Sequence, residues 1–377
     1  MMETTLPTHA DDLTLGVLNK VICAETPDAR LSDFSVVASH VWGDGNASSA
    51  GRIIIRPVYV HADASLPDHL VLKVARAAPE EPNKPLAIAG AGGALYENEV
   101  AVYRRLRPAT FLEAPMTLGG AYDPSSNALL LVMEDLRDRD ATFASVTVPT
   151  SLERMRSILD QLAVLHARYW QSAELTAGLS WMEKHTSGRL HQQFNNPAVV
   201  PRFIADQVER EQFKKEMVER LGTSPDGLFR RFQSVQRHQT GLPQTVCHGD
   251  THIGNTYILP GEKAGLLDWQ LASQGFCIHD VSYVIATGLS VEQRRTSERE
   301  LLAYYREQLI ANGCKEPPAS EELWREYRMA IVWGLYIGWL TTPVVNYGWE
   351  VSVLAHLRLT TAYEDLETSR LVDELDA

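Results

Sequence analysis

The hydrophobic pattern of this chain changes its period once, near residue 138. Before that point, three segments are rich in β-branched or apolar residues and read as strands: RIIIRPVYV at 52–60, HLVLKVA at 69–75 and NALLLVMEDL at 127–136. One helical pattern interrupts them at 94–107, and Pro108 ends it. The first third of the chain is therefore predicted to be a sheet that carries one main helix.

After residue 138 the apolar positions follow helical spacing. Ser151 is a candidate N-cap for the segment LERMRSILDQLAVLHARYW, in which apolar residues recur every three or four positions. The region 244–285 breaks the helical pattern with short strand-like pieces around YILP and AGLLDW. Further helices are predicted near 202–220, 226–238, 291–312, 320–340 and 350–374.

The length supports a division into two parts. A chain of 377 residues exceeds the size at which one hydrophobic core usually stops growing. We therefore expect an α+β, bilobal fold: residues 1–132 form a small β-rich N-terminal lobe, 133–138 a hinge, and 139–377 a larger, mostly helical C-terminal lobe.

Charge and composition limit the partners. A net charge of −13 argues against general nucleic-acid binding, which needs a basic face. The most apolar stretch, 329–340, is too short to cross a bilayer, and the N-terminal dozen residues lack the apolar core of a signal peptide. The four cysteines form no CxxC pair, which is typical of reduced thiols. We expect a cytoplasmic protein without a membrane partner; the oligomeric state stays open.

The densest group of chemically active residues is VCHGDTHIGNT at 246–256, followed by GLLDWQ. A zinc site would use His248, Asp250 and His252, but a stable site needs further ligands, and only His279 and Asp280 lie nearby in the sequence. A metallophosphatase would need a GDxHG run and a GNHE run. Ile253 stands where the first run needs glycine, and the second run is absent.

A third template, the catalytic loop of protein kinases, fits this stretch. That loop reads H-R-D-x-x-x-x-N and is followed by a second metal-binding aspartate. His248, Asp250 and Asn255 occupy the frame, and Gly249 replaces the arginine. Phosphoryl transfer needs positioning and charge neutralisation more than covalent help. Asp250 is therefore the predicted catalytic carboxylate, and Asn255 and Asp268 are the predicted oxygen ligands for the Mg²⁺ that accompanies ATP.

These residues carry a family resemblance. HGDxHxGN followed by an apolar run and DW resembles the aminoglycoside phosphotransferase and choline-kinase-like superfamily, and the details are most similar to its ecdysteroid kinase-like and choline kinase-like branch. AVLHARYW at 163–170 and the continuation IHDVSYVI resemble further motifs of these small-molecule kinases. The resemblance covers roughly 35–340 and is strongest at 246–283. It implies a protein-kinase-like fold, with ATP and Mg²⁺ as cofactors and a small hydroxylated molecule as the acceptor.

The resemblance implies further parts in the N-terminal lobe. A phosphate-covering turn would use Gly45, Asn46 and Ser48, although a plain tight turn has the same composition. Lys73 would pair with Glu99 and set the α- and β-phosphates. Glu99 shares a helical stripe with Leu95, Val102 and Leu106, a buried position where a carboxylate needs a partner, whereas Glu97 projects away.

A hinge and a supporting loop complete the expected site. Backbone groups near Met133 and Asp135 would bind the adenine edge, with Met133 or Leu136 against the ring, although a simple strand end has the same sequence. His248 and Asp280 are expected to brace the catalytic loop, and His279 to be a surface or loop-contact residue. The role of His252 stays open between a substrate contact and a phosphate contact.

The acceptor is less constrained. Aromatic residues crowd 333–350, which holds few charges and predicts an apolar or amphipathic alcohol, although such residues at helical spacing are more often core. The alternatives are an aminoglycoside- or choline-type kinase, a non-catalytic nucleotide-binding protein, a protein kinase and a metal-dependent hydrolase. The chain runs from Asp268 straight into WQLASQGF without a long activation loop, which favours a small acceptor. The choice between ATP and GTP stays open.

Overall fold

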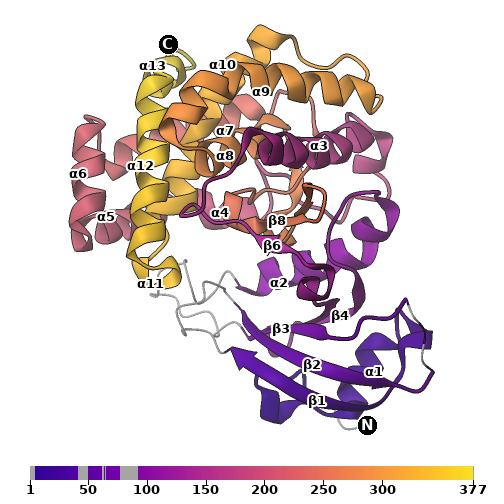
Figure 1. Cartoon of the computed structure of the whole chain (residues 1–377). Coiled ribbons are helices and arrows are strands. Elements are labelled where there is room, and N and C mark those ends of the chain that lie inside the picture. Colours follow the sequence, from indigo (N-terminus) through magenta and orange to yellow (C-terminus); the bar gives the residue numbers. More distant parts are fainter. Residues whose placement is uncertain (1–4, 41–49, 62, 64, 77–91, 377) are drawn as a thin grey trace. The chain divides into compact units, whose positions relative to one another are not determined.

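The computed structural model describes residues 5–40, 50–61, 63, 65–76 and 92–376, which form two compact units. Unit 1 is Met1–Thr142 and unit 2 is Phe143–Ala377. An antiparallel sheet dominates the first unit and helices dominate the second, so the predicted α+β, bilobal fold class is correct (Figure 1). The predicted hinge, 133–138, lies inside unit 1.

Unit 1 is built on one five-stranded antiparallel sheet in the order β1-β2-β3-β5-β4. Its strands are β1 Leu31–His40, β2 Gly51–Tyr59, β3 Leu70–Arg76, β4 Thr117–Asp123 and β5 Ala128–Glu134. The three predicted strand segments all appear. The edge strand β4 escaped prediction because its sequence, TLGGAYD, contains two glycines and little alternation.

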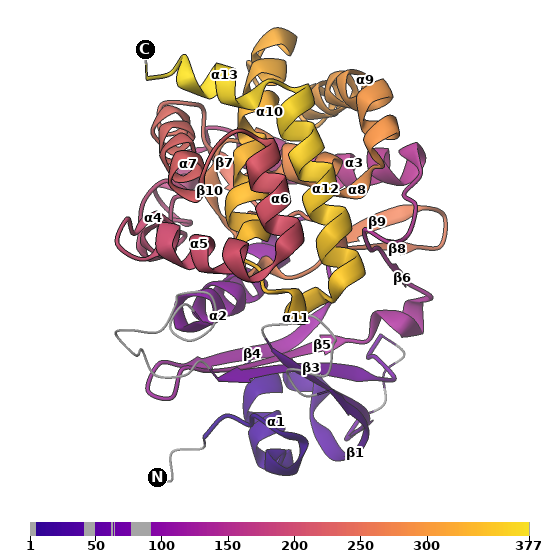
Figure 2. The ribbon, with the colours of Figure 1, turned by 90° about the vertical axis from the view of Figure 1, so that its left-hand side faces the viewer.

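Two helices cover opposite faces of this sheet (Figure 2). Helix α1 (Leu15–Ile22) packs against one face, where the alternate residues of β2, β3 and β5 form the core. Helix α2 (Gly92–Ala101) covers the other face and continues as a π-helix through Val102–Leu106. The sheet therefore has two buried faces, and a charge that points out of its centre towards α2 must be buried.

Unit 2 consists mainly of helices, in agreement with the sequence pattern. They are α3 Leu152–Tyr169, α4 Arg189–Asn195, α5 Val200–Arg210, α6 Gln212–Arg220, α7 Pro225–Gln239, α8 Ile278–Gly288, α9 Val291–Ala311, α10 Ser320–Trp333, α11 Val344–Tyr347, α12 Trp349–Asp365 and α13 Thr368–Asp373. Ser151 caps α3 as expected, because its side chain accepts from the N–H of Arg154. Helix α10 runs on as a π-helix, Gly334–Leu340.

Helix α8 forms the centre of this unit, and all of its residues are buried. It packs against α3, α9, α10 and α12 (Figure 1). Because α8 is only 11 residues long and is buried on every side, it lacks the long apolar and polar stripes by which the other helices are recognised in the sequence.

Short strands carry the loops of unit 2. They are β6 Thr142–Phe143, β7 Thr245–Cys247, β8 Thr256–Leu259, β9 Lys263–Leu266 and β10 Ser273–Gly275. They form a pair, β10-β7, and a three-stranded sheet in the order β6-β8-β9. Among the residues that the structure describes, no helix is both long and apolar enough to cross a membrane.

Candidate functional site

The predicted catalytic loop connects β7 to β8 and turns sharply at Gly249. This residue has a φ of +85°, and a Cβ atom there would lie 2.0 Å from the carbonyl oxygen of Leu271. A side chain would meet both a disfavoured backbone conformation and a backbone atom that has no room to move. The glycine that replaces the arginine of the protein-kinase frame is therefore required by this turn.

Asp280 holds the loop from the first turn of α8. Its carboxylate accepts the N–H of His248 at 2.6 Å and the N–H of Gly249 at 2.8 Å, and Thr251 donates its hydroxyl to the Asp280 carbonyl. The side chain of His166, on α3, donates to the same carboxylate at 3.1 Å. The prediction that Asp280 braces the catalytic loop by hydrogen bonds is confirmed.

The charge of Asp280 is stabilised in the core. Burial alone would raise the pKa of its carboxyl group. The hydrogen bond from His166 and the neighbouring imidazoles outweigh burial and lower this pKa from 3.8 to about 2. Asp280 is therefore an anion at neutral pH, and it binds the loop through charge-assisted hydrogen bonds.

The histidines around the loop are structural contacts. His248 donates from Nε2 to the Leu267 carbonyl and accepts at Nδ1 from the N–H of Asp250, so both ring nitrogens are used. His279 donates from Nε2 to the carbonyl of Gly249 at 3.0 Å. His279 is buried. The expected contact with the loop is therefore correct, and the alternative that His279 lies at the surface is wrong. Burial lowers the pKa of both rings, which keeps them neutral.

The three residues assigned to chemistry come together in unit 2. Asn255 donates from Nδ2 to the Asp250 carbonyl at 2.8 Å and to its carboxylate at 3.1 Å. Strands β8 and β9 pair as a hairpin, and just beyond it the N–H of Leu267 donates to the carbonyl of Asn255 at 2.8 Å. Asp268 follows directly, in the left-handed conformation with φ 60° and ψ 71°. Such strained positions are concentrated at functional sites.

This donor set suits a hard cation. Because the amide nitrogen of Asn255 is occupied by Asp250, its Oδ1 is the atom left to meet a ligand. An amide oxygen together with the carboxylate of Asp268 matches the ligand preference of Mg²⁺. Among the described residues, His248, Asp250 and His252 do not form a cluster of potential metal ligands, so they lack the geometry that a zinc site requires.

The described part of the chain contains one cluster of three potential ligands, His166, Cys247 and Asp280. Two of these are already bonded, since His166 binds both Asp280 and the hydroxyl of Tyr305. We regard it as part of the brace. His166 lies in the LHARYW segment noted in the sequence, but its partner Tyr305 comes from α9, 139 residues later in the chain, and could not be inferred from spacing.

Unit 1 contains the expected ion pair. Lys73 on β3 and Glu99 on α2 approach to 2.8 Å between Nζ and Oε1, and they are 6% and 1% exposed. Strand β3 is central in the sheet, so Lys73 is not a solvated edge residue. Glu97 is exposed, which agrees with the choice of Glu99. A buried pair of opposite charges needs each partner to offset the desolvation of the other.

The end of β5 has specific bonds of its own. The N–H groups of Glu134 and Asp135 donate to the carbonyls of Met116 and His69. The Asp135 carboxylate caps the 3₁₀ turn Leu136–Arg139 and pairs with Arg137. Met133 is half-buried. The side chain of Asp135 thus stabilises the end of strand β5. The predicted phosphate-covering turn, with Gly45, Asn46 and Ser48, lies outside the described residues.

The aromatic residues of 333–350 divide into two groups. Trp333, Tyr336 and Trp339 are buried in the helical core, whereas Trp349 is 60% exposed. Trp339 and Tyr347 approach His252 with ring centroids near 6 Å. Burial lowers the pKa of His252 to about 4, so it is neutral at physiological pH. Core packing accounts for much of this aromatic content.

The fold is that of small-molecule kinases. A choline kinase from Cryptosporidium parvum Iowa II superposes over 96% of both chains with a TM-score of 0.52 and 11% identity. A spectinomycin phosphotransferase covers 96% of this chain and 98% of its own, with 10% identity and a TM-score of 0.47. At such low identity, the likeness to the choline kinase is one of fold.

Sequence comparison gives the family. The chain belongs to the ecdysteroid kinase-like family, which it matches over residues 69–315. A kinase-like protein of Caenorhabditis elegans is 26% identical over 102 residues, which are 26% of this chain and 27% of that protein. The match thus spans about a quarter of the length of this curated relative.

Proposed function

We propose that this protein transfers the γ-phosphoryl group of ATP to a hydroxyl group of a small molecule. The observation that supports the proposal most directly is the arrangement of Asp250, Asn255 and Asp268. The amide of Asn255 is bonded to Asp250, and its backbone is bonded to the residue that precedes Asp268. Phosphoryl transfer by positioning and charge neutralisation needs this combination of oxygen ligands and a carboxylate base.

The residues of the loop have separate roles in the proposed reaction. The Asp250 carboxylate orients the acceptor hydroxyl and takes its proton as the oxygen attacks the γ-phosphorus. The bond from phosphorus to the β-phosphate oxygen breaks, so the products are a phosphate monoester and ADP. Mg²⁺, when bound by Asn255 and Asp268, supplies positive charge for the phosphate oxygens. Asp280 fixes the peptide that precedes Asp250 and leaves that carboxylate in position.

Residues of unit 1 are proposed to hold the nucleotide. Lys73, oriented by Glu99, binds the α- and β-phosphates, and backbone amides near Gly45, Asn46 and Ser48 cover them. We place the adenine ring near Met133. Asp135 serves that segment as a cap, because its carboxylate is bonded to Arg137.

The acceptor is proposed to be an uncharged or amphipathic alcohol. Cationic acceptors such as choline or aminoglycosides require carboxylates or open aromatic faces around the positive charge. The segment 333–350 supplies many rings and one carboxylate, Glu350, which is exposed. A sterol, a terpenoid or a hydroxy-acyl compound has the matching chemistry.

Nucleotide binding and turnover test this proposal separately. Wild-type protein should be stabilised against heat by ATP with Mg²⁺, and Asp268→Ala should lose most of this stabilisation because a cation ligand is gone. Asp250→Asn should bind Mg·ATP nearly as well as wild type but lose turnover. The matched control is Asp63→Asn, which changes an exposed carboxylate in unit 1 and should alter neither property.

Other outcomes would separate the alternatives. Unchanged Mg·ATP binding by Asp268→Ala would refute the metal assignment. Binding without turnover of any alcohol in a broad panel would favour a non-catalytic nucleotide-binding protein. Release of phosphate from monoesters without ATP would favour a hydrolase.

A further inference from the structure

His252 lies in the catalytic loop, two residues after Asp250, and its side chain caps the 3₁₀ turn Ile253–Asn255. The backbone N–H of Gly254 donates to Nδ1 of the imidazole at 3.2 Å. Because a backbone amide can only donate, Nδ1 is the acceptor, and the proton of the neutral ring is on Nε2. The turn thus selects the tautomer of His252 in which Nε2 is a hydrogen-bond donor.

The position of this ring is fixed by the residues around it. A Cβ atom at Gly254 would lie 2.9 Å from Cε1 of the His252 ring and 3.1 Å from Nδ1, so a larger residue would displace the imidazole. The rings of Tyr283, Trp339 and Tyr347 lie around it, with centroids 5.9–6.0 Å from its own. The donor at Nε2 is therefore held in place before any ligand binds.

The backbone on either side of His252 is bonded to helix α8. The hydroxyl of Thr251 donates to the carbonyl of Asp280 at 2.7 Å. The N–H of Ile253 donates to the hydroxyl of Thr287 at 3.1 Å. Because all residues of α8 are buried, the core of unit 2 sets the position of the ring.

Nε2 of His252 is the side-chain donor of the loop that is not used within the described part of the chain. The other side-chain donors of residues 248–255 all donate to groups of the protein itself; they belong to His248, Thr251 and Asn255. Nε2 of His252 makes no hydrogen bond to any residue that the structure describes. The residue is only 6% exposed, and a buried donor without an acceptor is unfavourable. We therefore expect the acceptor of this hydrogen bond to be a ligand.

The chemistry of the loop favours an anionic ligand. Residues 246–256 contain neither lysine nor arginine, so the loop offers a phosphate no fixed positive charge of its own. A phosphoryl group in transit spreads its charge over three equatorial oxygens. An N–H group that donates to such an oxygen forms a charge-assisted hydrogen bond, which is roughly twice as strong as one between neutral groups.

The ring of His252 remains a neutral donor at physiological pH. Burial lowers the pKa of His252 to about 4, although the charge of Asp268 acts in the opposite direction. The influence of Asp268 also shows that the ring lies within the electrostatic field of the proposed metal ligand.

We propose that His252 donates a hydrogen bond from Nε2 to an oxygen of the γ-phosphoryl group, and that position 254 is glycine because the imidazole occupies the space of a Cβ atom. The ring keeps its proton throughout the reaction. Asp250 takes the proton of the acceptor hydroxyl, whereas His252 supplies a fixed dipole to the charge that develops on the phosphoryl oxygens. The inference rests on the proposed function, since it adds a catalytic residue to that reaction.

The affinities for Mg·ATP and Mg·ADP test this contact without an acceptor, because only ATP carries the γ-phosphate. Isothermal titration calorimetry of the full chain gives both dissociation constants, and the preference is the ratio of the ADP value to the ATP value. In His252→Asn the side-chain oxygen can still cap the turn, but the Nε2 donor is gone. Mg·ATP should bind about ten- to a hundredfold more weakly than to wild type, as expected for one lost hydrogen bond to a charged group, and Mg·ADP within about twofold of wild type.

Three more variants make the test specific. His252→Gln places an amide N–H near the position of Nε2 and should retain more of the preference than His252→Asn does. Gly254→Ala should reduce the preference with His252 unchanged, because the added Cβ displaces the ring. His238→Asn is the matched control, since it also removes an imidazole, one on α7 whose Nε2 bonds to Glu326 at 2.8 Å. This variant should keep the preference.

The outcomes distinguish this inference from the proposed function. An unchanged preference in His252→Asn, an equal loss of affinity for both nucleotides, or a lower preference in His252→Gln than in His252→Asn would each overturn the inference. Binding of Mg·ATP and phosphorylation of an alcohol by the wild type would still support the proposed function in these cases. Wild-type protein that binds neither nucleotide would refute the proposed function together with the inference.

Discussion

Asp280→Asn is the change that most directly tests how the helical unit positions its catalytic loop. Asp280 accepts three hydrogen bonds, from the N–H groups of His248 and Gly249 and from the side chain of His166. Asparagine has the same shape but offers one oxygen and an NH₂ group. The oxygen can keep the bonds to His248 and His166, and the NH₂ group then faces the N–H of Gly249.

The cost follows from these contacts. One charge-assisted hydrogen bond disappears, and a buried N–H loses its acceptor, which together correspond to about 2–4 kcal/mol of unfolding free energy. Catalysis should fall as well, because the Gly249 peptide leads directly into Asp250. A displacement on the order of 1 Å reduces turnover by about 100-fold.

The effect depends on pH with a definite sign. The pKa of Asp280 is about 2, below its ordinary value of 3.8. A carboxylate with a lowered pKa stabilises the folded state fully above the unfolded-state pKa, and this stabilisation is lost as the pH falls through the folded-state value. The stability difference between wild type and Asp280→Asn should therefore be constant near neutrality and shrink from about pH 4 towards about pH 2.

Urea unfolding at several pH values, combined with steady-state turnover, measures both effects. The control is Asp160→Asn. Asp160 accepts one hydrogen bond from Tyr304, and asparagine retains an acceptor for it, so we expect a change within about 0.5 kcal/mol. If Asp280→Asn unfolds and turns over like this control, the brace does not position the loop. A difference that grows on acidification would show that the sign of the pKa shift is wrong.

Two further changes test other parts of the molecule. Lys73→Met should destabilise unit 1 by about 3–5 kcal/mol, because it removes the ammonium beside a buried carboxylate. The double variant with Glu99→Leu should recover much of this lost stability in urea unfolding. Both variants should bind Mg·ATP weakly. Gly338→Ala should cost about 1–3 kcal/mol by overpacking, since its Cβ would lie 2.2 Å from Tyr283 Oη. Gly16→Ala, on α1, where the nearest atom to the added Cβ would be Thr14 Oγ1 at 4.0 Å, should be neutral or slightly stabilising; thermal unfolding compares the two glycine variants. Equal unfolding of the single and double Lys73 variants, or of the two glycine variants, would contradict the respective argument.

The ion pair of unit 1 shows how far a single sequence can reach. Lys73 stands among alternating apolar residues, and Glu99 stands on an apolar helical stripe. Burial of an unpaired charge is so costly that each position predicts a partner of opposite sign, and the family resemblance implies that these two residues pair with each other. The structure places the two atoms 2.8 Å apart. The same reasoning cannot predict an adenine contact at the end of β5, because backbone groups would make that contact and their hydrogen bonds do not depend on the identity of the side chain.

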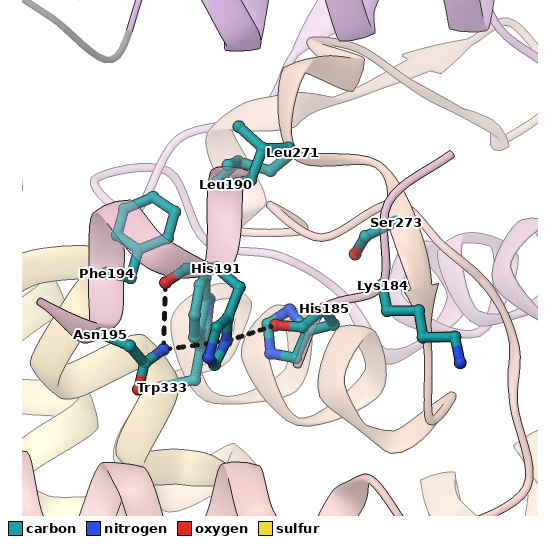
Figure 3. Close-up of a pocket in the computed structure, with 9 residues that line it drawn as sticks. All are labelled: Lys184, His185, Leu190, His191, Phe194, Asn195, Leu271, Ser273 and Trp333. Carbon is teal, nitrogen blue, oxygen red and sulfur yellow. Dashed lines mark hydrogen bonds between the residues drawn. The ribbon is translucent and has the colours of Figure 1, made fainter. Parts of the chain in front are cut away.

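A small hollow in unit 2, lined by residues of α4, α10 and β10, shows what a sequence pattern cannot predict (Figure 3). His185 and His191 belong to a stretch without clear periodicity, and Ser273 is one small residue between two strand-like pieces. Their common feature is a position around one hollow, which depends on how α4, α10 and β10 pack. Of the segment 333–350, where sequence analysis expected the acceptor or core packing, Trp333 lines this hollow, whereas Tyr336 and Trp339 are buried in the core.

The sequence by itself determined the fold class, the loop that carries the proposed chemistry and the charge pair in the sheet. These depend on local periodicity, fixed spacing and the cost of burying charge, all of which are encoded residue by residue. The sequence also predicts that Asp280 braces the loop, but the tertiary structure alone decided that His166 bonds to the Asp280 carboxylate and that the helix carrying Asp280 is wholly buried. Such contacts join residues more than a hundred positions apart, and their selection is a matter of packing that no local pattern records.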